Sequence, residues 1–262
     1  MRHSKSTGRN PELREWTDRY RDSNNLRFFG DALADFSKKK IGNGGMMVIG
    51  LLGQRDIPGH TLRVAQSILR WDQRPSLWSH VFLIEDKVTL RSTEVGRVKV
   101  CEAPLFSRSG QFPHPEHNGV GSVELKNYDD PKVDANAALL AIQMSDSDAK
   151  RVKQRANEPN HDRLRYNLWE SLGIWQGYLW SQGARPNPLR EGVPIIASSY
   201  AEMAYEAIEL DLTPGASIRN SAPEHIWNAA VWWHDTFARQ KHPISGYYVL
   251  RDKGGSLVST DD

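Results

Sequence analysis

The sequence predicts an α+β fold in which helices pack against a central antiparallel sheet, with a helical extension at the N-terminus. Three observations support this class. Short β-branched segments such as 81–84 and 98–100 are separated by charged turns, as in antiparallel sheets. Longer segments carry apolar residues at helical spacing. The chain has 262 residues, of which 39% are hydrophobic and 25% charged, which is enough for one substantial core.

Residues 1–45 are assigned to the extension because they are polar and basic and end in Lys38-Lys-Lys-Ile-Gly-Asn-Gly-Gly45. The Lys38–Lys40 run is interpreted as a solvated helix end. Apolar residues between 11 and 36 predict one or two amphipathic helices packed on the main domain, which takes up 46–262. These residues are Leu13, Trp16, Tyr20, Leu26, Phe29, Leu33 and Phe36.

The first half of the main domain is predicted to contain a buried strand, a helix and then further strands. The segment 46–52 is continuously apolar and of strand length. A helix is predicted over 60–71, with an apolar face formed by Leu62, Val64, Ala65, Ile68, Leu69 and Trp71. Strands are predicted at 81–84, 88–90 and 98–100. Residues 102–132 are rich in Pro, Gly, His and Asn, which predicts a long loop.

The second half begins with a strand at 139–144, followed by a helix that starts at Ser145. Acidic residues occupy its first turn and basic residues follow, which complements the helix dipole. A turn is predicted at Pro214-Gly215, a helix from Pro223 and a closing strand at 246–251. Between the helix that starts at Ser145 and this turn, the segment 164–180 is apolar and rich in tryptophan.

Composition excludes several classes of function. The formal net charge is +2, from 34 basic and 32 acidic residues, so we expect no nucleic-acid partner. Cys101 is the only cysteine, which excludes intramolecular disulfides and a cysteine-rich zinc site. No apolar run approaches the ~18 residues of a membrane span, and the N-terminus lacks the apolar region of a signal peptide. We expect a soluble protein, cytoplasmic or exported without a signal peptide.

Two distant motifs point to chemistry. Ser79-His80-Val81 places a histidine at the start of a predicted strand. Far downstream, the segment 194–207 predicts a short apolar strand that runs into a helix, with Ala197 at the junction. The pair resembles the permuted papain-like branch of the NlpC/P60 superfamily, the YiiX/YaeF-like hydrolases. In that branch a Cys-Ser dipeptide opens the late helix, and here the dipeptide is Ala197-Ser198.

The resemblance covers roughly residues 46 to 251, with several pieces in family order. Tyr205 matches a tyrosine eight residues after the family's cysteine. The other pieces are Arg165-Tyr-Asn-Leu168, Pro214-Gly215 and Ser221-Ala-Pro-Glu224. The resemblance implies a permuted papain-like fold and a cysteine hydrolase that cleaves an amide, ester or thioester through an acyl-cysteine intermediate. Its substrate would be a peptide, peptidoglycan or a lipid-acyl group, with no cofactor and no metal.

The family also implies roles for individual residues. A cysteine at position 197 would lie over free helix amides, and those of Ser198 and Ser199 would hold the oxyanion. His80 would be the general base, facing position 197 across a cleft. The family often places an acid on the strand after the histidine. A simple alignment puts Arg91 there, which cannot accept a hydrogen bond, so Glu94 is the predicted third residue. A backbone carbonyl or the polar side chain of Ser92 or Thr93 is the alternative.

The chain as given lacks the nucleophile, which leaves two interpretations open. It is a thiol hydrolase inactivated by alanine at 197, either by deliberate replacement or in nature. The alternative is a non-catalytic binding module that holds a peptide, lipid or protein partner. A protein partner could contact the N-terminal extension. Ser198 is disfavoured as the nucleophile because its side chain points about 100° round the helix.

Simpler interpretations apply to the remaining chemistry-bearing residues. His80 could be a core histidine with satisfied nitrogens. Cys101 is interpreted as a small buried hydrophobe. His114-Pro-Glu-His117 has metal-like spacing but is interpreted as a surface loop. The tryptophans are assigned mostly to the core, with some available to line an apolar groove. They are Trp169, Trp175, Trp180, Trp227, Trp232 and Trp233.

Overall fold

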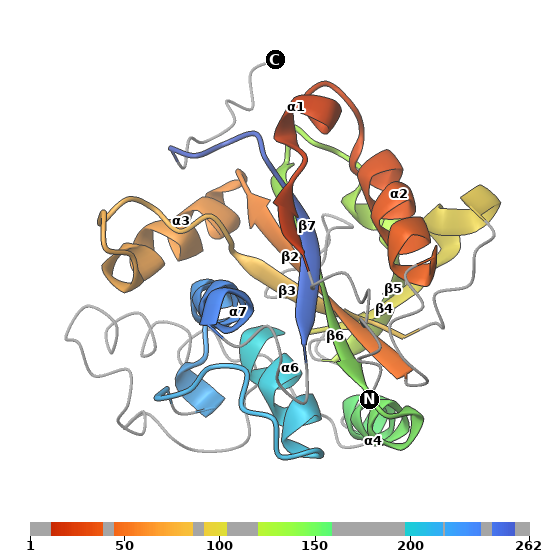
Figure 1. The fold of residues 1–262 in the computed structure, drawn as a ribbon. Helices are drawn as coiled ribbons and strands as arrows, with labels where there is room; N and C mark the ends of the chain where they lie inside the picture. Colours follow the sequence, from red (N-terminus) through yellow and green to blue (C-terminus); the bar gives the residue numbers. More distant parts are fainter. Residues whose placement is uncertain are drawn as a thin grey trace, which may run out of the picture.

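The computed structural model describes residues 12–38, 45–85, 92–103, 120–158, 197–216, 218–236 and 243–254. Within them the chain is α+β, as predicted, with a seven-stranded sheet in the order β1-β7-β6-β2-β3-β4-β5 (Figure 1). Every neighbouring pair is antiparallel except β1 and β7, which are parallel. The strands are β1 (Leu13–Glu15), β2 (Gly45–Gln54), β3 (His80–Ile84), β4 (Lys99–Glu102), β5 (Gly121–Glu124), β6 (Asp134–Met144) and β7 (Ile244–Leu250).

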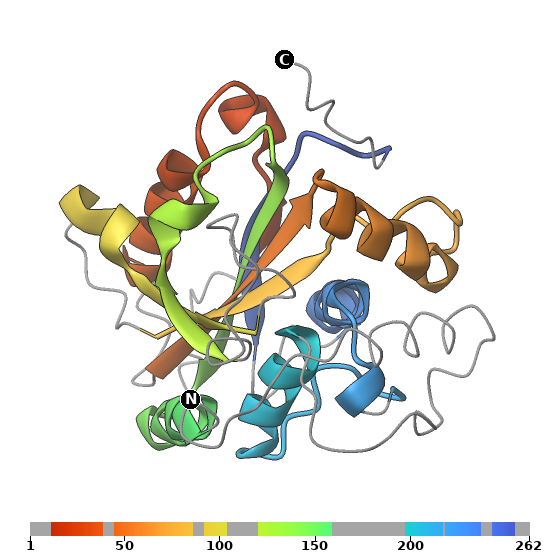
Figure 2. The ribbon, with the colours of Figure 1, turned by 180° about the vertical axis from the view of Figure 1, so that it is seen from behind.

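Helices cover both faces of this sheet (Figures 1 and 2). The α-helices are α1 (Thr17–Tyr20), α2 (Asn25–Lys38), α3 (Ile57–Ala65), α4 (Asp146–Asn157), α6 (Ala197–Glu206) and α7 (Pro223–Thr236). Short 3-10 helices are η1 (Gln66–Leu69), η2 (Ser92–Arg97), η3 (Leu125–Tyr128) and η5 (Ile218–Asn220). Among the described residues, no helix is long and apolar enough to cross a membrane.

The sheet separates two hydrophobic cores. Because side chains alternate along a strand, β2 sends Ile49 and Leu51 to one core and Val48 and Leu52 to the other. The first, here called the α6 core, lies beneath α4, α6 and α7. The second, the α2 core, lies beneath α1, α2 and η3. A strand buried on both faces must be apolar throughout, which explains the continuous apolar run that predicted β2.

The N-terminal segment contributes helices, as predicted, and also a strand. The apolar face of α2 packs in the α2 core through Phe28, Phe29 and Phe36, among others. Before it, β1 pairs with β7 and extends the main sheet. Trp16 then stacks on Tyr247 of β7, with ring centroids 3.8 Å apart. The segment is therefore joined to the main sheet by backbone pairing as well as by packed helices.

Local signals place the starts of α3 and α4. Asp56 caps α3 by accepting a hydrogen bond from the Gly59 amide at 2.8 Å. Ser145 caps α4 by accepting from the Asp148 amide at 3.0 Å, as the sequence predicted. At the predicted Pro214-Gly215 turn, Gly215 has a φ of +88°, a conformation that favours glycine.

The structure differs from the sequence-based expectations over 60–71 and 102–132, and three other predicted segments are not described. The helix over 60–71 forms as α3 followed by η1, but much of its apolar face points to solvent, as described below. Part of the predicted loop over 102–132 forms β5 and η3 instead. The segments 88–90, 164–180 and 194–196 lie outside the described residues.

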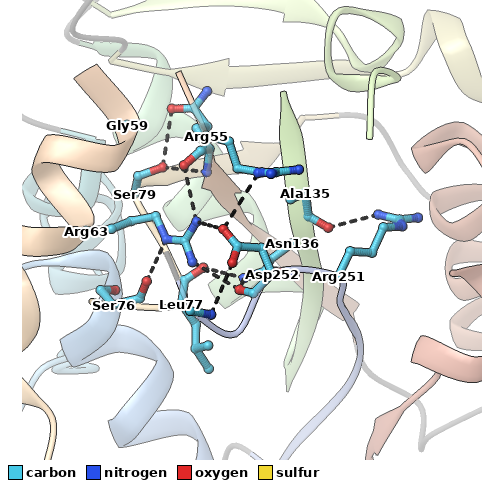
Figure 3. A network of polar contacts seen from close by, with 12 residues as sticks. Arg55, Gly59, Arg63, Ser76, Leu77, Ser79, Ala135, Asn136, Arg251 and Asp252 are labelled. Atoms are coloured by element: carbon cyan, nitrogen blue, oxygen red, sulfur yellow. Dashed lines mark hydrogen bonds and ion pairs between the residues drawn. The ribbon is translucent and has the colours of Figure 1, made fainter. Parts of the chain in front are cut away.

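A buried arginine fastens the end of the described chain to α3. Arg63 donates from Nε to the Ser76 carbonyl at 2.6 Å and from Nη1 to the Asp252 carboxylate at 2.9 Å (Figure 3). Asn136 of β6 donates to the Asp252 carbonyl at 2.8 Å and accepts from the Asp252 amide at 2.9 Å. Burial lowers the pKa of Arg63, and Asp252 opposes that shift by favouring the charged guanidinium. The inner side of α3 is therefore polar.

Candidate functional site

His80 opens β3, and its backbone is fixed by the residue before it. The Ser79 amide donates to the Leu52 carbonyl at 2.7 Å, and Ser79 Oγ accepts from the Gln54 amide at 2.9 Å. Leu52 and His80 are then paired across the β2–β3 ladder. These bonds determine the face of the sheet from which the imidazole projects.

The imidazole of His80 contacts a buried carboxylate on the next strand. Nε2 of His80 lies 2.5 Å from Oε2 of Glu102, and both side chains are buried. The Tyr128 hydroxyl donates to the same carboxylate oxygen. A carboxylate that holds one ring nitrogen fixes the orientation of an imidazole, as in catalytic His–acid pairs. Nδ1 is then the nitrogen left for any further chemistry.

Phe82 helps to place Tyr128 over this pair. The two rings are stacked, with centroids 5.3 Å apart and an interplanar angle of 3°. Phe82 lies opposite Glu102 in the β3–β4 ladder, so all three side chains share one face of the sheet. Gly50 on β2 makes room for the ring, because a Cβ there would lie 2.0 Å from Phe82.

The third residue predicted from sequence, Glu94, is not the acid that contacts His80. Its side chain is 66% exposed in η2, and its carboxylate lies 3.4 Å from Arg97. Strand β4 pairs with β3, and the acid on that strand is Glu102. The useful signal was Glu102 at the end of the alternating segment Val98–Cys101, the acid on the strand that follows the histidine.

The predicted nucleophile position lies at the start of α6. Ala197 is buried in the α6 core, which also contains Val81 and Leu83 of β3. Ser198 is fully buried, and its hydroxyl donates to the Ser221 carbonyl at 2.6 Å. The Ser199 hydroxyl is buried and has no hydrogen-bond partner in the described part of the chain. Neither serine is an exposed nucleophile.

The structure does not bring His80 and Ala197 together across one cleft. Val81 and Leu83 point toward α6, whereas Phe82 packs in the α2 core on the other face. Because side chains alternate along β3, His80 projects from the same face as Phe82. Its contacts with Glu102 and Tyr128 lie on that face. The sheet therefore separates the imidazole from position 197, contrary to the arrangement that the family motif implied.

A second buried carboxyl group, which the sequence did not single out, lies on α6. Glu202 accepts hydrogen bonds from the Leu212 amide at 2.8 Å and the Thr213 amide at 3.4 Å. Burial, together with a hydrogen bond to the neighbouring Asp211, raises the pKa of Glu202 to about 8. The signal was an acid in a helix whose other residues are mostly apolar. Glu202 is remote from His80 because it lies in the layer on the opposite side of the sheet.

The other residues that the sequence singled out are Cys101, several tryptophans and two histidines, and the structure describes only some of them. Cys101 is buried, as expected, and its thiol donates to the Glu85 carboxylate. Trp227 is buried and Trp233 packs partly buried against the α6 core, whereas Trp232 is 53% exposed. His114 and His117 lie outside the described residues, as do Trp169, Trp175 and Trp180. Within the described ranges, no group of three or more His, Cys, Asp or Glu side chains could hold a metal ion.

Comparison of the chain with protein-family models, with curated proteins and with solved structures found no match. Function is therefore inferred from the residues and their geometry.

Proposed function

We propose that this chain is a binding module on a papain-like scaffold and does no thiol chemistry. The observation that supports this most is the position of Ala197. Its methyl group packs in the α6 core, whereas the imidazole of His80 is held by Glu102 on the opposite face. The ligand would be a peptide, a lipid or a protein partner.

Thiol catalysis requires a nucleophile at position 197 and a general base close to it, and both requirements fail. A general base must come within hydrogen-bond reach of the group that it deprotonates, about 3 Å or one bridging water. Alanine has no proton to give and no lone pair for attack. A sheet between position 197 and His80 also removes the arrangement in which an introduced thiol would be activated. The helix amides alone cannot attack a carbonyl carbon.

A thiol hydrolase inactivated at position 197 is the second candidate. The observation that favours it is the His80–Glu102 pair, because the acid follows the histidine on the neighbouring strand. Such a pair is the orienting half of a Cys–His–acid triad. For this candidate, α6 would have to present position 197 to the His80 face of the sheet.

Restoring the thiol separates the two candidates. We expect the Ala197→Cys variant to react with iodoacetamide no faster than a buried thiol, with a midpoint at or above the ordinary pKa of about 8.5. Its rate should be unchanged when His80→Ala is added, because the imidazole lies on the other face. The measurement is alkylation followed peptide by peptide across pH, with Cys101 as an internal buried reference.

The opposite result would establish the hydrolase. If the thiol introduced by Ala197→Cys reacts near neutral pH, slows with His80→Ala or Glu102→Gln and turns over an acyl substrate, the binding module is overturned. Glu94→Gln is the matched control, since this carboxylate is exposed and contacts Arg97. A binding module should instead bind its ligand equally well with and without His80→Ala, as measured by calorimetry against peptides, muropeptides and acyl lipids.

A further inference from the structure

The run formed by α3 and η1 is inverted relative to an ordinary surface helix. Its inner side buries polar residues: Arg63 is fully buried and Gln66 is 2% exposed. Its outer side carries Ile57 at 71% exposed, Val64 at 45%, Ile68 at 44% and, just past η1, Trp71 at 96%. A surface helix normally turns its apolar stripe to the core. We call the four exposed residues the outer stripe.

The outer stripe follows the helical run from its start to just past its end. Ile57 and Val64 lie seven residues apart on α3, about two turns, so they share one side of that helix. Ile68 follows in η1, and Trp71 lies just past Arg70, whose extended backbone ends the run. From Ile57 to Leu69 the run is roughly 20 Å long. One polar position, Thr61, interrupts the stripe, and its hydroxyl is turned back onto the Ile57 carbonyl at 2.7 Å. Apart from Trp232 on α7, these are the exposed large hydrophobic residues of the described chain.

The polar core of the run explains why the stripe faces outward. The guanidinium of Arg63 is bound by Asp252 and by the Ser76 carbonyl. The Gln66 amide nitrogen donates to the Trp78 carbonyl at 3.3 Å, and its oxygen accepts from the Glu224 amide at 3.1 Å. These bonds hold the apolar side toward solvent. Rotating the stripe inward would leave a buried charge unpaired, so its exposure is built into the fold.

The position and size of the outer stripe favour a lipid bilayer over a folded protein as its binding partner. In both views α3 lies at the margin of the molecule (Figures 1 and 2). The four side chains expose on the order of a few hundred Å², whereas a stable dimer buries about 800 Å² on each partner. A helix at the margin can bury its exposed apolar side chains in a lipid interface, where Trp is a preferred residue.

Charge near the stripe is compatible with anionic headgroups. Asp56 is occupied as the helix cap, and Asp72 is held by Arg70 at 2.8 and 2.9 Å. Arg74, exposed beyond Trp71, adds a positive charge at that end. These two acidic side chains are thus occupied, and a cation accompanies the exposed tryptophan. An exposed tryptophan beside an exposed cation suits the interface of an anionic membrane.

We propose that the outer stripe docks the protein onto the surface of a lipid bilayer, with α3 lying parallel to the membrane and Trp71 in the interfacial layer. Arg74 faces the phosphate groups. The inference does not depend on the absence or presence of hydrolase activity, because it concerns a surface on a separate helix. It specifies a peripheral attachment and not a span.

Vesicle flotation tests this attachment. The full chain is mixed with vesicles of equal parts phosphatidylcholine and phosphatidylglycerol, and the fraction that floats in a density gradient is measured. We expect Ile68→Ser with Trp71→Ser to lower the partition coefficient at least tenfold, because two large apolar side chains are lost from the interface. Thr61→Leu should raise it severalfold by adding an apolar side chain to the stripe, and a sharp thermal transition of this variant shows that the gain does not come from misfolding.

A matched pair of charge variants tests the orientation. Arg74→Gln should weaken binding to anionic vesicles about fivefold and leave binding to pure phosphatidylcholine vesicles nearly unchanged. Arg97→Gln removes the same charge from a side chain that is 75% exposed on η2, away from α3, and should change neither. Circular dichroism confirms that each variant is folded.

Two results would overturn the proposal. One is flotation that is absent, or that is unaffected by both the serine pair and Thr61→Leu. The other is self-association in vesicle-free buffer that the serine pair abolishes, measured by sedimentation, since the occupant of the stripe would then be a second copy of the chain.

Discussion

At the residue scale, Glu102 is the most strongly connected group of the candidate site. One carboxylate oxygen holds both the imidazole of His80 and the hydroxyl of Tyr128, in a place closed to solvent. Removing such a group destabilises the fold, because the polar atoms of its partners stay buried with neither the carboxylate nor water as a hydrogen-bond partner. A similar consideration applies to Glu202, whose carboxyl group is buried beside another acid.

We expect Glu102→Ala to lower the free energy of unfolding by about 3 kcal/mol, since it leaves two buried polar side chains unpaired and opens a cavity. Urea denaturation measures the change. Glu94→Ala is the matched control and should cost less than about 0.5 kcal/mol, because Glu94 is exposed. Equal losses for the two variants would contradict the burial of Glu102.

The carboxyl group of Glu202 should make stability fall as pH rises. Its pKa is raised to about 8 in the folded chain from an ordinary value of 4.5, because burial disfavours the charged form. Between these two values the folded state binds more protons than the unfolded state. Stability from this group is therefore complete below pH 4.5 and lost as pH rises through about 8, by an amount on the order of a few kcal/mol.

Thermal unfolding against pH measures this loss. Glu202→Gln should flatten the curve between pH 5 and 8, because the amide cannot ionise; that window lies between the two pKa values just given. Glu206→Gln, on the exposed side of the same helix, should leave the curve as it is. Parallel curves for the wild type and Glu202→Gln over this window would contradict the raised pKa of Glu202.

At the element scale, short-range rules predicted where elements begin, and long-range contacts decided which way they face. The caps at Asp56 and Ser145 are local, so signals of this kind lie within reach of the sequence. Periodicity shows that a helix has an apolar side, but not that this side meets the core. For α3 the deciding partner is Asp252, which lies 189 residues from Arg63. No local pattern contains that information.

The strand pairing that decides the site was likewise beyond local rules. The family resemblance implied that an acid would follow His80 on the next strand, but no local pattern showed that β4 pairs with β3, and Glu94 was chosen in place of Glu102. Short strands such as β1, of three residues, carry too little pattern to be recognised. The placement of His80 and Ala197 on opposite faces follows from register, which the motif alone does not contain.

We expect Arg63→Lys to destabilise the fold by about 3 kcal/mol although it keeps the charge. An ammonium group cannot reproduce the fork that reaches the Asp252 carboxylate and the Ser76 carbonyl together. Urea denaturation is again the measurement. Arg21→Lys, in an exposed pair with Asp18, is the control and should be nearly neutral. Tolerance of Arg63→Lys would mean that the polar side of α3 is not what orients it.

At the scale of the whole molecule, the sheet separates two hydrophobic cores. Helices α4, α6 and α7 close one side, and the N-terminal helices close the other. The N-terminal segment therefore covers one face of the sheet, where Phe28, Phe29 and Phe36 are buried. The α2 core also contains the ring of Phe82 that positions Tyr128 beside His80.

Deleting residues 1–38 should prevent cooperative folding, because one face of the sheet would lose its cover and β7 its parallel neighbour. We expect strong binding of a hydrophobic dye and no sharp thermal transition. A chain that begins at Glu12 keeps every described residue of the segment and is the control, with a transition close to that of the full chain. A folded product from the longer deletion would show that the main domain is independent.

The position of β7 has a consequence for how the chain is made. Strand β7, the last of the described strands, lies between β6 and β1, and it is the only described strand that pairs with β1. During synthesis, Leu13–Glu15 leave the ribosome early, yet their partners Gly246–Tyr248 emerge only much later. The nascent chain must therefore wait, with an incomplete sheet edge at β6, until these residues are released. Folding of this sheet is completed late in synthesis or after it, and a chain that is cut short before β7 cannot join its first strand to the sheet.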